Sequence, residues 1–186
     1  MGNMIDSREA SEALAEINEM TRRVRQSRIY NLASLMLIMW GVLVFGGYLV
    51  TYVSPRHAGY GWTAVYAGGL IGSIVIGRLN HARAGVRTFD LRMLAAFVLL
   101  MLFGIFVSVW LGHFSPRQLS TFWPIYFMLF YTIAGLWAGY AFAAIGLSII
   151  ALTLVGYFYV GPAFDLWMAF VNGGGLLLGG LWMRRS

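Results

Sequence analysis

Six apolar stretches, each roughly 20 residues long, alternate with short polar segments along most of the chain. A helix of that length covers about 30 Å at 1.5 Å per residue, which matches the hydrocarbon thickness of a bilayer. The pattern therefore predicts an all-α integral membrane protein with six transmembrane helices. The predicted spans lie near residues 31–53, 61–78, 92–113, 120–140, 143–160 and 164–183.

The boundary between the fourth and fifth spans is the least marked one, because no charged residue occurs between Arg117 and Asp165. A single helix over residues 118–164 would be about 70 Å long, more than twice the hydrocarbon thickness. The chain must therefore turn back, and the predicted reversal is at Gly139-Tyr140, followed by Gly146. If this stretch stayed at the membrane surface, the number of spans would fall to five or four.

Residues 1–28 differ from the rest of the chain in being polar and charged. Asp6 and Glu9 fit the capping box of a helix, and an apolar stripe follows at helical spacing. The stripe consists of Ala10, Ala13, Ile17, Met20 and Val24. One interpretation is a solvated helix that leads into the first span. The other is a short coiled coil or a docking helix on which Ile17, Met20 and Val24 contact a cytoplasmic protein.

All basic residues are arginines, and their distribution predicts the orientation of the chain. The N-terminus, the 78–92 loop and the C-terminus carry all of them except Arg56 and Arg117, which fall on the other side. An excess of arginine marks the cytoplasmic side, so both termini are predicted there. Arginines at helix ends also favour anionic lipid over nucleic acid as the partner for the net charge of +6. Because lysine codons are A-rich, the absence of Lys indicates a GC-rich bacterial genome. The predicted location is the bacterial inner membrane.

The predicted outer turns have a spacing that indicates an internal repeat. Pro55 precedes Trp62 by seven residues, and Pro116 precedes Trp123 by seven, while Pro162 precedes Trp167 by five. Each tryptophan opens the second helix of a pair, at the interfacial depth that such rings prefer. Glycines four residues apart then occur in each second helix: Gly68/Gly72, Gly135/Gly139 and Gly175/Gly179. We therefore predict three tandem helical hairpins that pack through these GxxxG faces.

Three hairpins behind a charged N-terminal segment resemble the layout of the small six-span bacterial acid-resistance membrane proteins. The resemblance is one of topology, covers residues 31–183 and carries no activity with it. On the residues themselves, the chain divides into a cytoplasmic amphipathic helix over residues 1–28 and a six-helix transmembrane domain over residues 29–186.

The predicted spans contain no Asp, Glu, Arg or His near their centres. Ionisable groups inside a membrane are costly and usually functional, and coupled transporters normally use an intramembrane carboxylate. The chain has no cysteine, and it contains no catalytic, phosphate-binding or metal-ligand motif. The sequence therefore predicts neither an enzyme nor a bound cofactor or metal.

Four positions are candidates for contact with a ligand or for a solute path. Asn172 is the strongest polar residue at depth, and the competing interpretation is an interhelical hydrogen bond within a glycine seam. Gly174 follows it, and position 178, although occupied by Leu178, completes the helical spacing. Trp137 is predicted to lie deeper than the interfacial aromatic residues. It could line a cavity for a flat apolar ligand, or pack in the core.

A second group of candidates lies on the predicted outer face: Arg56, His57, His113 and Arg117. These side chains could contact lipid head groups, or they could simply be exposed to water.

The leading functional hypothesis is a small accessory, regulatory or scaffold protein of the inner membrane, acting through protein or lipid contacts. Association with further copies of the same chain is compatible with it. Two alternatives remain open: a passive channel or transporter for a small neutral or lipidic solute, and a lipid- or quinone-binding subunit of a larger membrane complex.

Overall fold

A computed structural model describes residues 7–84 and 91–185. Within these ranges, only the backbone is described for residues 7–10, 18, 21–26, 28–29, 80–84, 91–94 and 138. The predicted cap at Asp6 and residues 85–90 of the predicted 78–92 loop lie outside the described residues.

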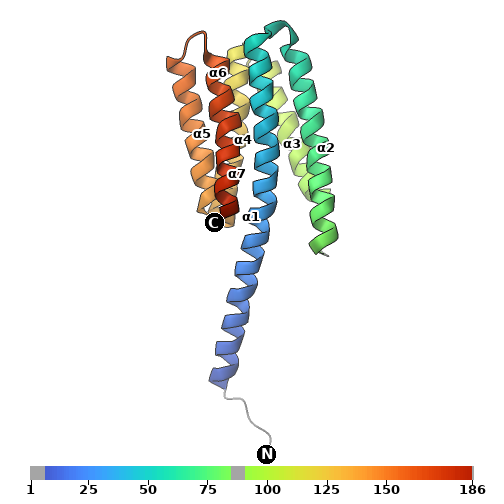
Figure 1. Ribbon diagram of the computed structural model, residues 1–186, viewed down its shortest axis with the longest axis vertical. Coiled ribbons are helices and arrows are strands. Elements are labelled where there is room, and N and C mark those ends of the chain that lie inside the picture. Colours follow the sequence, from blue (N-terminus) through green and yellow to red (C-terminus); the bar gives the residue numbers. More distant parts are fainter. Residues whose placement is uncertain (1–6, 85–90, 186) are drawn as a thin grey trace, which may run out of the picture.

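All regular elements of the described residues are helical (Figure 1). In chain order they are α1 (Ser7–Val53), the 3-10 turn η1 (Pro55–His57), α2 (Ala58–Ala84), α3 (Leu91–Ile105), the π-helical η2 (Phe106–Leu111), α4 (Pro116–Ala138), α5 (Tyr140–Tyr159), α6 (Phe164–Met168), the π-helical η3 (Ala169–Gly174) and α7 (Gly175–Arg185). Because α6, η3 and α7 follow one another without a break, we call them together the last rod.

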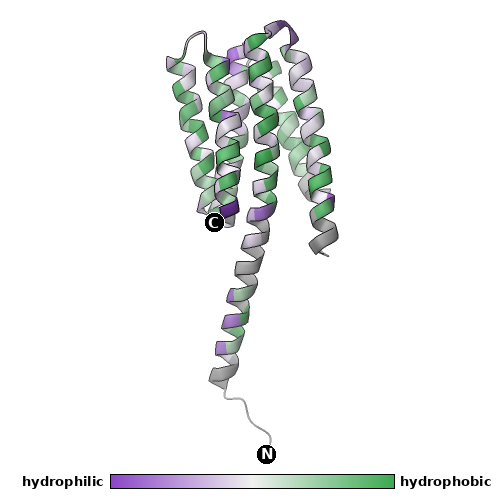
Figure 2. Ribbon diagram, viewed as in Figure 1, coloured by the Kyte–Doolittle hydropathy of each residue, from purple (hydrophilic) through white to green (hydrophobic). Residues whose placement is uncertain are grey.

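Five helical stretches of the described chain are long and apolar enough to cross a membrane. They are Tyr30–Val53, Pro55–Leu79, Pro116–Trp137, Tyr140–Tyr159 and Phe164–Arg185, and Ala95–Leu111 is a shorter apolar helix. Hydrophobic residues cover the bundle along most of its height (Figure 2). The predicted class, a multi-pass helical membrane protein, is therefore confirmed, whereas the sixth span and the hairpin repeat stay predictions.

Helix α1 is a single unbroken helix of 47 residues. At 1.5 Å per residue it is about 70 Å long, so it exceeds the height of the bundle. Its first part, residues 7–29, projects beyond the other helices and is called the arm (Figure 1). The C-terminus lies at the same end of the bundle, which we call the arm end. The opposite end, which carries η1 and the links at residues 112–115 and 160–163, is called the loop end.

The chain reverses direction at Gly139, where the sequence predicts the turn between the fourth and fifth spans. Helix α4 ends at Ala138 and α5 begins at Tyr140, so a single residue joins them. Gly139 has φ 137°, a conformation that side chains with a Cβ rarely adopt. Gly146 lies inside α5 instead of in the turn. A Cβ there would stand 2.8 Å from the carbonyl oxygen of Met128, so this glycine lets α4 and α5 pack closely.

The last rod is the most buried part of the bundle. In its most apolar stretch 50% of the residues are buried, compared with 11% in that of the span Pro55–Leu79. It packs against α1, where the Ser34 hydroxyl donates a 2.7 Å hydrogen bond to the carbonyl of Gly180. A Cβ on Gly41 would lie 2.9 Å from the Gly173 carbonyl oxygen, so the two backbones nearly touch. Helices α1, α4, α5 and the last rod thus share the main core, while α2 and α3 lie at its side.

Candidate functional site

The two charged residues that flank the long uncharged stretch of the sequence both lie at the loop end. Arg117 is the second residue of α4, and Asp165 is the second residue of α6. Because α4 and α5 run antiparallel about Gly139, the chain returns to the end where it started. The charges of Arg117 and Asp165 lie close enough to interact.

The guanidinium of Arg117 also closes the C-terminal end of α5. Its Nη2 atom donates to the carbonyls of Tyr157, at 2.8 Å, and of Gly156, at 3.4 Å, and also to the carbonyl of Val160. The last carbonyls of a helix have no partner within the helix and carry its negative dipole end. A positive charge with several N–H donors is therefore well suited to this position.

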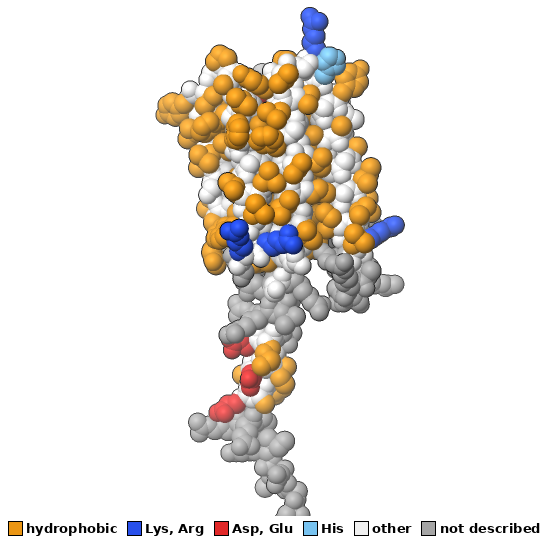
Figure 3. All heavy atoms as spheres, viewed as in Figure 1, with side chains coloured by type: hydrophobic (Ala, Val, Ile, Leu, Met, Phe, Trp, Pro, Cys, Tyr) orange, Lys and Arg blue, Asp and Glu red, His pale blue; other side chains and the backbone are white. Residues whose placement is uncertain are grey.

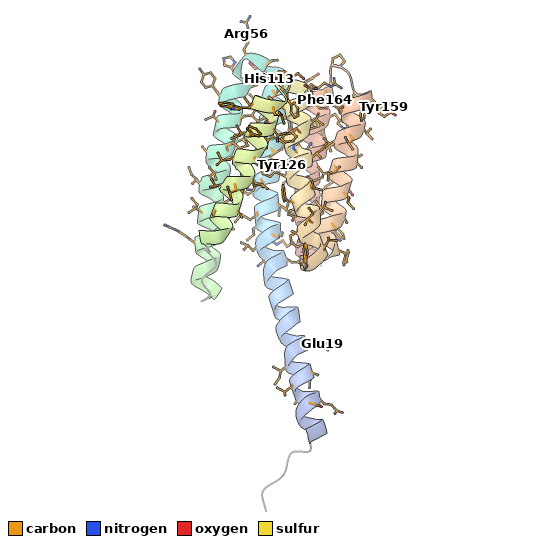
Figure 4. The ribbon with its side chains drawn as sticks, turned by 180° about the vertical axis from the view of Figure 1, so that it is seen from behind. Glu19, Arg56, His113, Tyr126, Tyr159 and Phe164 are labelled. Atoms are coloured by element: carbon orange, nitrogen blue, oxygen red, sulfur yellow. The ribbon has the colours of Figure 1, made fainter. Side chains whose placement is uncertain are left out.

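Aromatic rings surround the same guanidinium. Its central carbon lies 4.5 Å from the ring centre of Phe164 and 5.7 Å from that of Tyr157. Both distances are within the range of a cation–π interaction, which is stronger where water is scarce. Phe164 and the neighbouring end of α5, with Tyr159, are seen at the loop end in Figure 4.

Tyr48 of α1 joins this group through a defect in helix α4. Pro124 lies inside α4 and has no N–H, so the carbonyl of Ser120, four residues earlier, loses its usual helical partner. The hydroxyl of Tyr48, which is almost fully buried, donates to that carbonyl at 2.8 Å. The tyrosine thus satisfies a backbone group that the proline leaves open.

Together, these residues form one site at the loop end, the loop-end cluster, which consists of Tyr48, Arg117, Ser120, Tyr157, Phe164 and Asp165. They come from α1, α4, α5 and the last rod. The Tyr48 hydroxyl and the Arg117 guanidinium both donate to backbone carbonyls, so the arrangement is suited to hold helices and charge in place. Among the described residues, no group of three or more His, Cys, Asp or Glu side chains could bind a metal ion.

Asn172 lies within η3 and is only 3% exposed. Its Nδ2 atom donates to Oγ1 of Thr153 in α5, at 3.4 Å, and approaches the sulfur of Met168 at 3.5 Å. Thr153 is itself fully buried. This geometry matches the interpretation of Asn172 as an interhelical hydrogen bond between α5 and the last rod.

The other candidates for a ligand path do not gather around Asn172. A Cβ on Gly174 would face open space, with no atom of another helix within 4 Å. Leu178 is an exposed apolar residue on α7, so it does not provide the small surface that the helical pair with Gly174 would need. Trp137 is 81% exposed in the last turn of α4, at the arm end instead of at depth. The structure therefore does not bring the four positions into one site.

The four candidates on the predicted outer face do not form one surface in the structure. Arg56 and His57, in η1, and His113 are exposed at the loop end, where Figure 4 labels Arg56 and His113. The ring Nδ1 of His57 lies 2.7 Å from the hydroxyl oxygen of Ser54. Arg117 belongs to the loop-end cluster, where its guanidinium contacts α5, and so it does not lie on a surface shared with the other three.

The arm presents apolar side chains to its surroundings. Leu14, Ile17 and Met20 are 57% to 61% exposed, and hydrophobic and acidic side chains lie along the arm in Figure 3. The side chain of Val24, the third predicted docking residue, lies outside the described residues. Leu14 was not part of the predicted stripe, but it lies three residues before Ile17 and so on the same side of the helix.

Sequence reasoning missed Tyr48 and Asp165 as members of a site, although two signals were present. A proline inside a span leaves the carbonyl four residues earlier unpaired, and this predicts a polar partner on a neighbouring helix. Two charged residues that flank a long uncharged stretch must also lie at the same end of the bundle, if the stretch turns back once in its middle. The second signal depends on the turn at Gly139, whereas the first needs only a proline inside a helix.

No protein-family model matches the chain, and no curated protein or solved structure shows significant similarity to it. The functional proposals below therefore rest on the residues and geometry of this chain.

Proposed function

We propose that this protein is a small accessory or regulatory protein of the bacterial inner membrane, and that a cytoplasmic partner protein binds to its arm. The observation that carries the proposal is the continuity of α1. One helix of 47 residues begins in the exposed arm and also contains Tyr48 of the loop-end cluster. A partner bound to the arm is thereby joined through regular backbone hydrogen bonds to the core of the bundle.

The proposal includes six crossings of the membrane, arranged as three hairpins, with the arm end in the cytoplasm. Helix α3 and η2 together would form the third crossing, since they cover residues 91–111 without a break. An even number of crossings is supported by the position of the arm and the C-terminus at the same end of the bundle (Figure 1). The excess of arginine on that side supports the cytoplasmic assignment.

The partner-binding face of the arm would consist of Leu14, Ile17 and Met20. At 100° per residue, these three side chains fall within a sector of about 120° on one side of the helix. Acidic residues, Glu12, Glu16 and Glu19, occupy other sides of the same turns. The matching partner is a protein with an apolar groove for a helix and basic residues at its rim.

The proposal can be tested by comparing the proteins that crosslink to the chain in native membranes. The double variant Ile17→Glu with Met20→Glu places charges on the proposed face. Ala15→Glu adds one negative charge about 160° away from Ile17, and serves as the control for charge outside the proposed face. We expect a set of crosslinked cytoplasmic proteins that is lost from the double variant and kept by the control.

Equal sets of crosslinked proteins for all three chains would contradict the proposal, and so would an equal loss from both variants. Membrane insertion is checked for each variant by the amount of monodisperse protein extracted in detergent. Because the arm lies outside the bundle core, we expect the three amounts to agree.

A further inference from the structure

A group of aromatic and basic side chains lies at the arm end of the bundle, apart from the loop-end cluster. It consists of Trp137, Tyr140, Trp182, Arg184 and Arg185. These residues come from the last turn of α4, the first turn of α5 and the last turns of α7. The turn at Gly139 brings the first two elements to the place where α7 ends.

The aromatic residues form a partly exposed surface. The rings of Tyr140 and Trp182 meet edge to face, with ring centres 6.1 Å apart. Tyr140 is 72% exposed, and Trp137, three residues before it, is more exposed still. Exposed apolar residues lie within four positions of these rings along the chain: Leu136, Leu178 and Leu181. Tyrosine and tryptophan rings with such surroundings are typical of the level where hydrocarbon meets the head groups.

The charge at this end is entirely positive within the described bundle. Arg184 and Arg185 are exposed at the end of α7, and Arg185 lies three residues after Trp182, on the same side of the helix. Over residues 30–84 and 91–185, Asp165 is the one acidic residue, and it lies at the loop end. In Figure 3 the arginine side chains at the arm end, in blue, stand where the hydrophobic surface of the bundle ends.

We propose that Trp182, Tyr140, Arg184 and Arg185 form a binding site for one anionic phospholipid in the leaflet at the arm end. Guanidinium groups bind the phosphate oxygens through charge-assisted hydrogen bonds. The two rings contact the glycerol level, and the apolar residues beyond them contact the acyl chains. A phospholipid fits this surface better than a soluble anion, because the apolar part of the surface is continuous with the charged part.

Native mass spectrometry of the full chain in detergent tests the site. Phosphatidylglycerol and phosphatidylcholine with identical acyl chains are added separately, and their apparent Kd values are compared. An arginine near the membrane surface contributes roughly fivefold to the affinity for an anionic lipid. We expect tighter binding of phosphatidylglycerol, and a weakening of about 25-fold in the double variant Arg184→Gln with Arg185→Gln.

Arg78→Gln is the matched control, because Arg78 is also exposed near the arm end but belongs to α2. It is expected to leave the binding of phosphatidylglycerol unchanged, because Arg78 lies outside the proposed site, whereas Trp182→Leu should weaken the binding of both lipids. The proposal is overturned if the two lipids bind the wild-type chain equally. It is also overturned if Arg78→Gln weakens the binding of phosphatidylglycerol by about fivefold, the contribution of one arginine near the surface, which would show a diffuse ring of charge and no site.

Discussion

Tyr48 donates its hydroxyl to a carbonyl that Pro124 leaves without a backbone partner. Arg117 does the same for the carbonyls at the end of α5. In both cases a polar side chain in an apolar bundle is directed at backbone groups that regular helix geometry cannot satisfy. In hydrocarbon an unpaired carbonyl is costly, so each of these side chains stabilises the helix that it contacts as well as its own.

Replacement of Tyr48 by phenylalanine is expected to destabilise the bundle by about 0.6 to 1.7 kcal/mol, the range of hydrogen bonds between membrane helices. The loss depends on Pro124. Alanine at that position restores an N–H that can bond to the Ser120 carbonyl, so Tyr48→Phe should cost less in a Pro124→Ala background. A double-mutant cycle, with unfolding free energies measured in micelles, checks this. Equal costs in both backgrounds would show that the proline is not the reason for the bond.

Single-residue roles could be predicted from the sequence only in part. The sequence singles out Asn172 as a polar residue within a span, and its amide contacts Thr153, as one of its two interpretations expects. Arg117 was grouped with Arg56, His57 and His113 because all four fall in outer turns. A long arginine side chain can turn back onto the bundle, and the carbonyls that it contacts belong to residues about 40 positions later. Such a contact depends on tertiary structure.

At the scale of elements, neighbouring glycines differ in whether the packing of the helices leaves space for a Cβ atom. Gly173 in η3 faces the backbone of α1, where a Cβ would stand 2.5 Å from the Cα atom of Phe45. Gly174, the next residue, faces open space. The close approach of α1 and the last rod therefore depends on one glycine of the run, and the neighbouring one is free to change.

The two glycines give a matched pair of variants. Gly173→Ala forces backbone atoms apart and is expected to lower stability by about 1 to 3 kcal/mol, the usual cost of overpacking. Gly174→Ala should have no effect or raise stability slightly, since alanine favours helices more than glycine does. Thermal unfolding of both variants in the same detergent compares them. Similar midpoints would contradict the tight contact between α1 and the last rod.

The positions of the helices were largely predictable, because runs of about 20 apolar residues can form little else in a membrane. The turn at Gly139 was also predicted, because the length of the uncharged stretch requires a reversal and its glycines indicate the place. The sequence did not predict the π-helical segments η2 and η3. A π-helical turn accommodates an extra residue within a helix, and its place depends on how neighbouring helices pack. Nor did the pattern show that the helix of the first 28 residues and the first span are one element.

At the scale of the whole molecule, the number of crossings decides on which side of the membrane each end lies. The last rod and α1 form the centre, while α3 is held at the side through contacts such as the hydrogen bond from Tyr126 to the Leu100 carbonyl, at 3.0 Å. Helix α3 is the one whose crossing depends on the shorter apolar stretch. If it crosses, the arm and the C-terminus lie on one side of the membrane.

The absence of cysteine makes this prediction simple to test, because any introduced thiol is the only one in the chain. Gly59→Cys and Gly161→Cys introduce thiols at the loop end, where no atom lies within 4 Å of either new Cβ. With six crossings, a membrane-impermeant maleimide added to intact cells should label both, and should leave Ala15→Cys unlabelled. Labelling of only one of the two loop-end positions would show that α3 does not cross.

Because α1 is unbroken, adding residues to the arm changes both its length and the direction that its apolar surface faces. Adding two residues between Met20 and Tyr30 would turn the Leu14–Met20 surface by about 200° relative to the bundle, and would leave its chemistry unchanged. Adding seven would restore its bearing almost completely and raise it by about 10 Å. The length of the helix therefore sets both the height of this surface above the bundle and the direction that it faces. A protein held by the arm would face one fixed direction at one fixed height above the bilayer, and its search for membrane targets would take place in two dimensions.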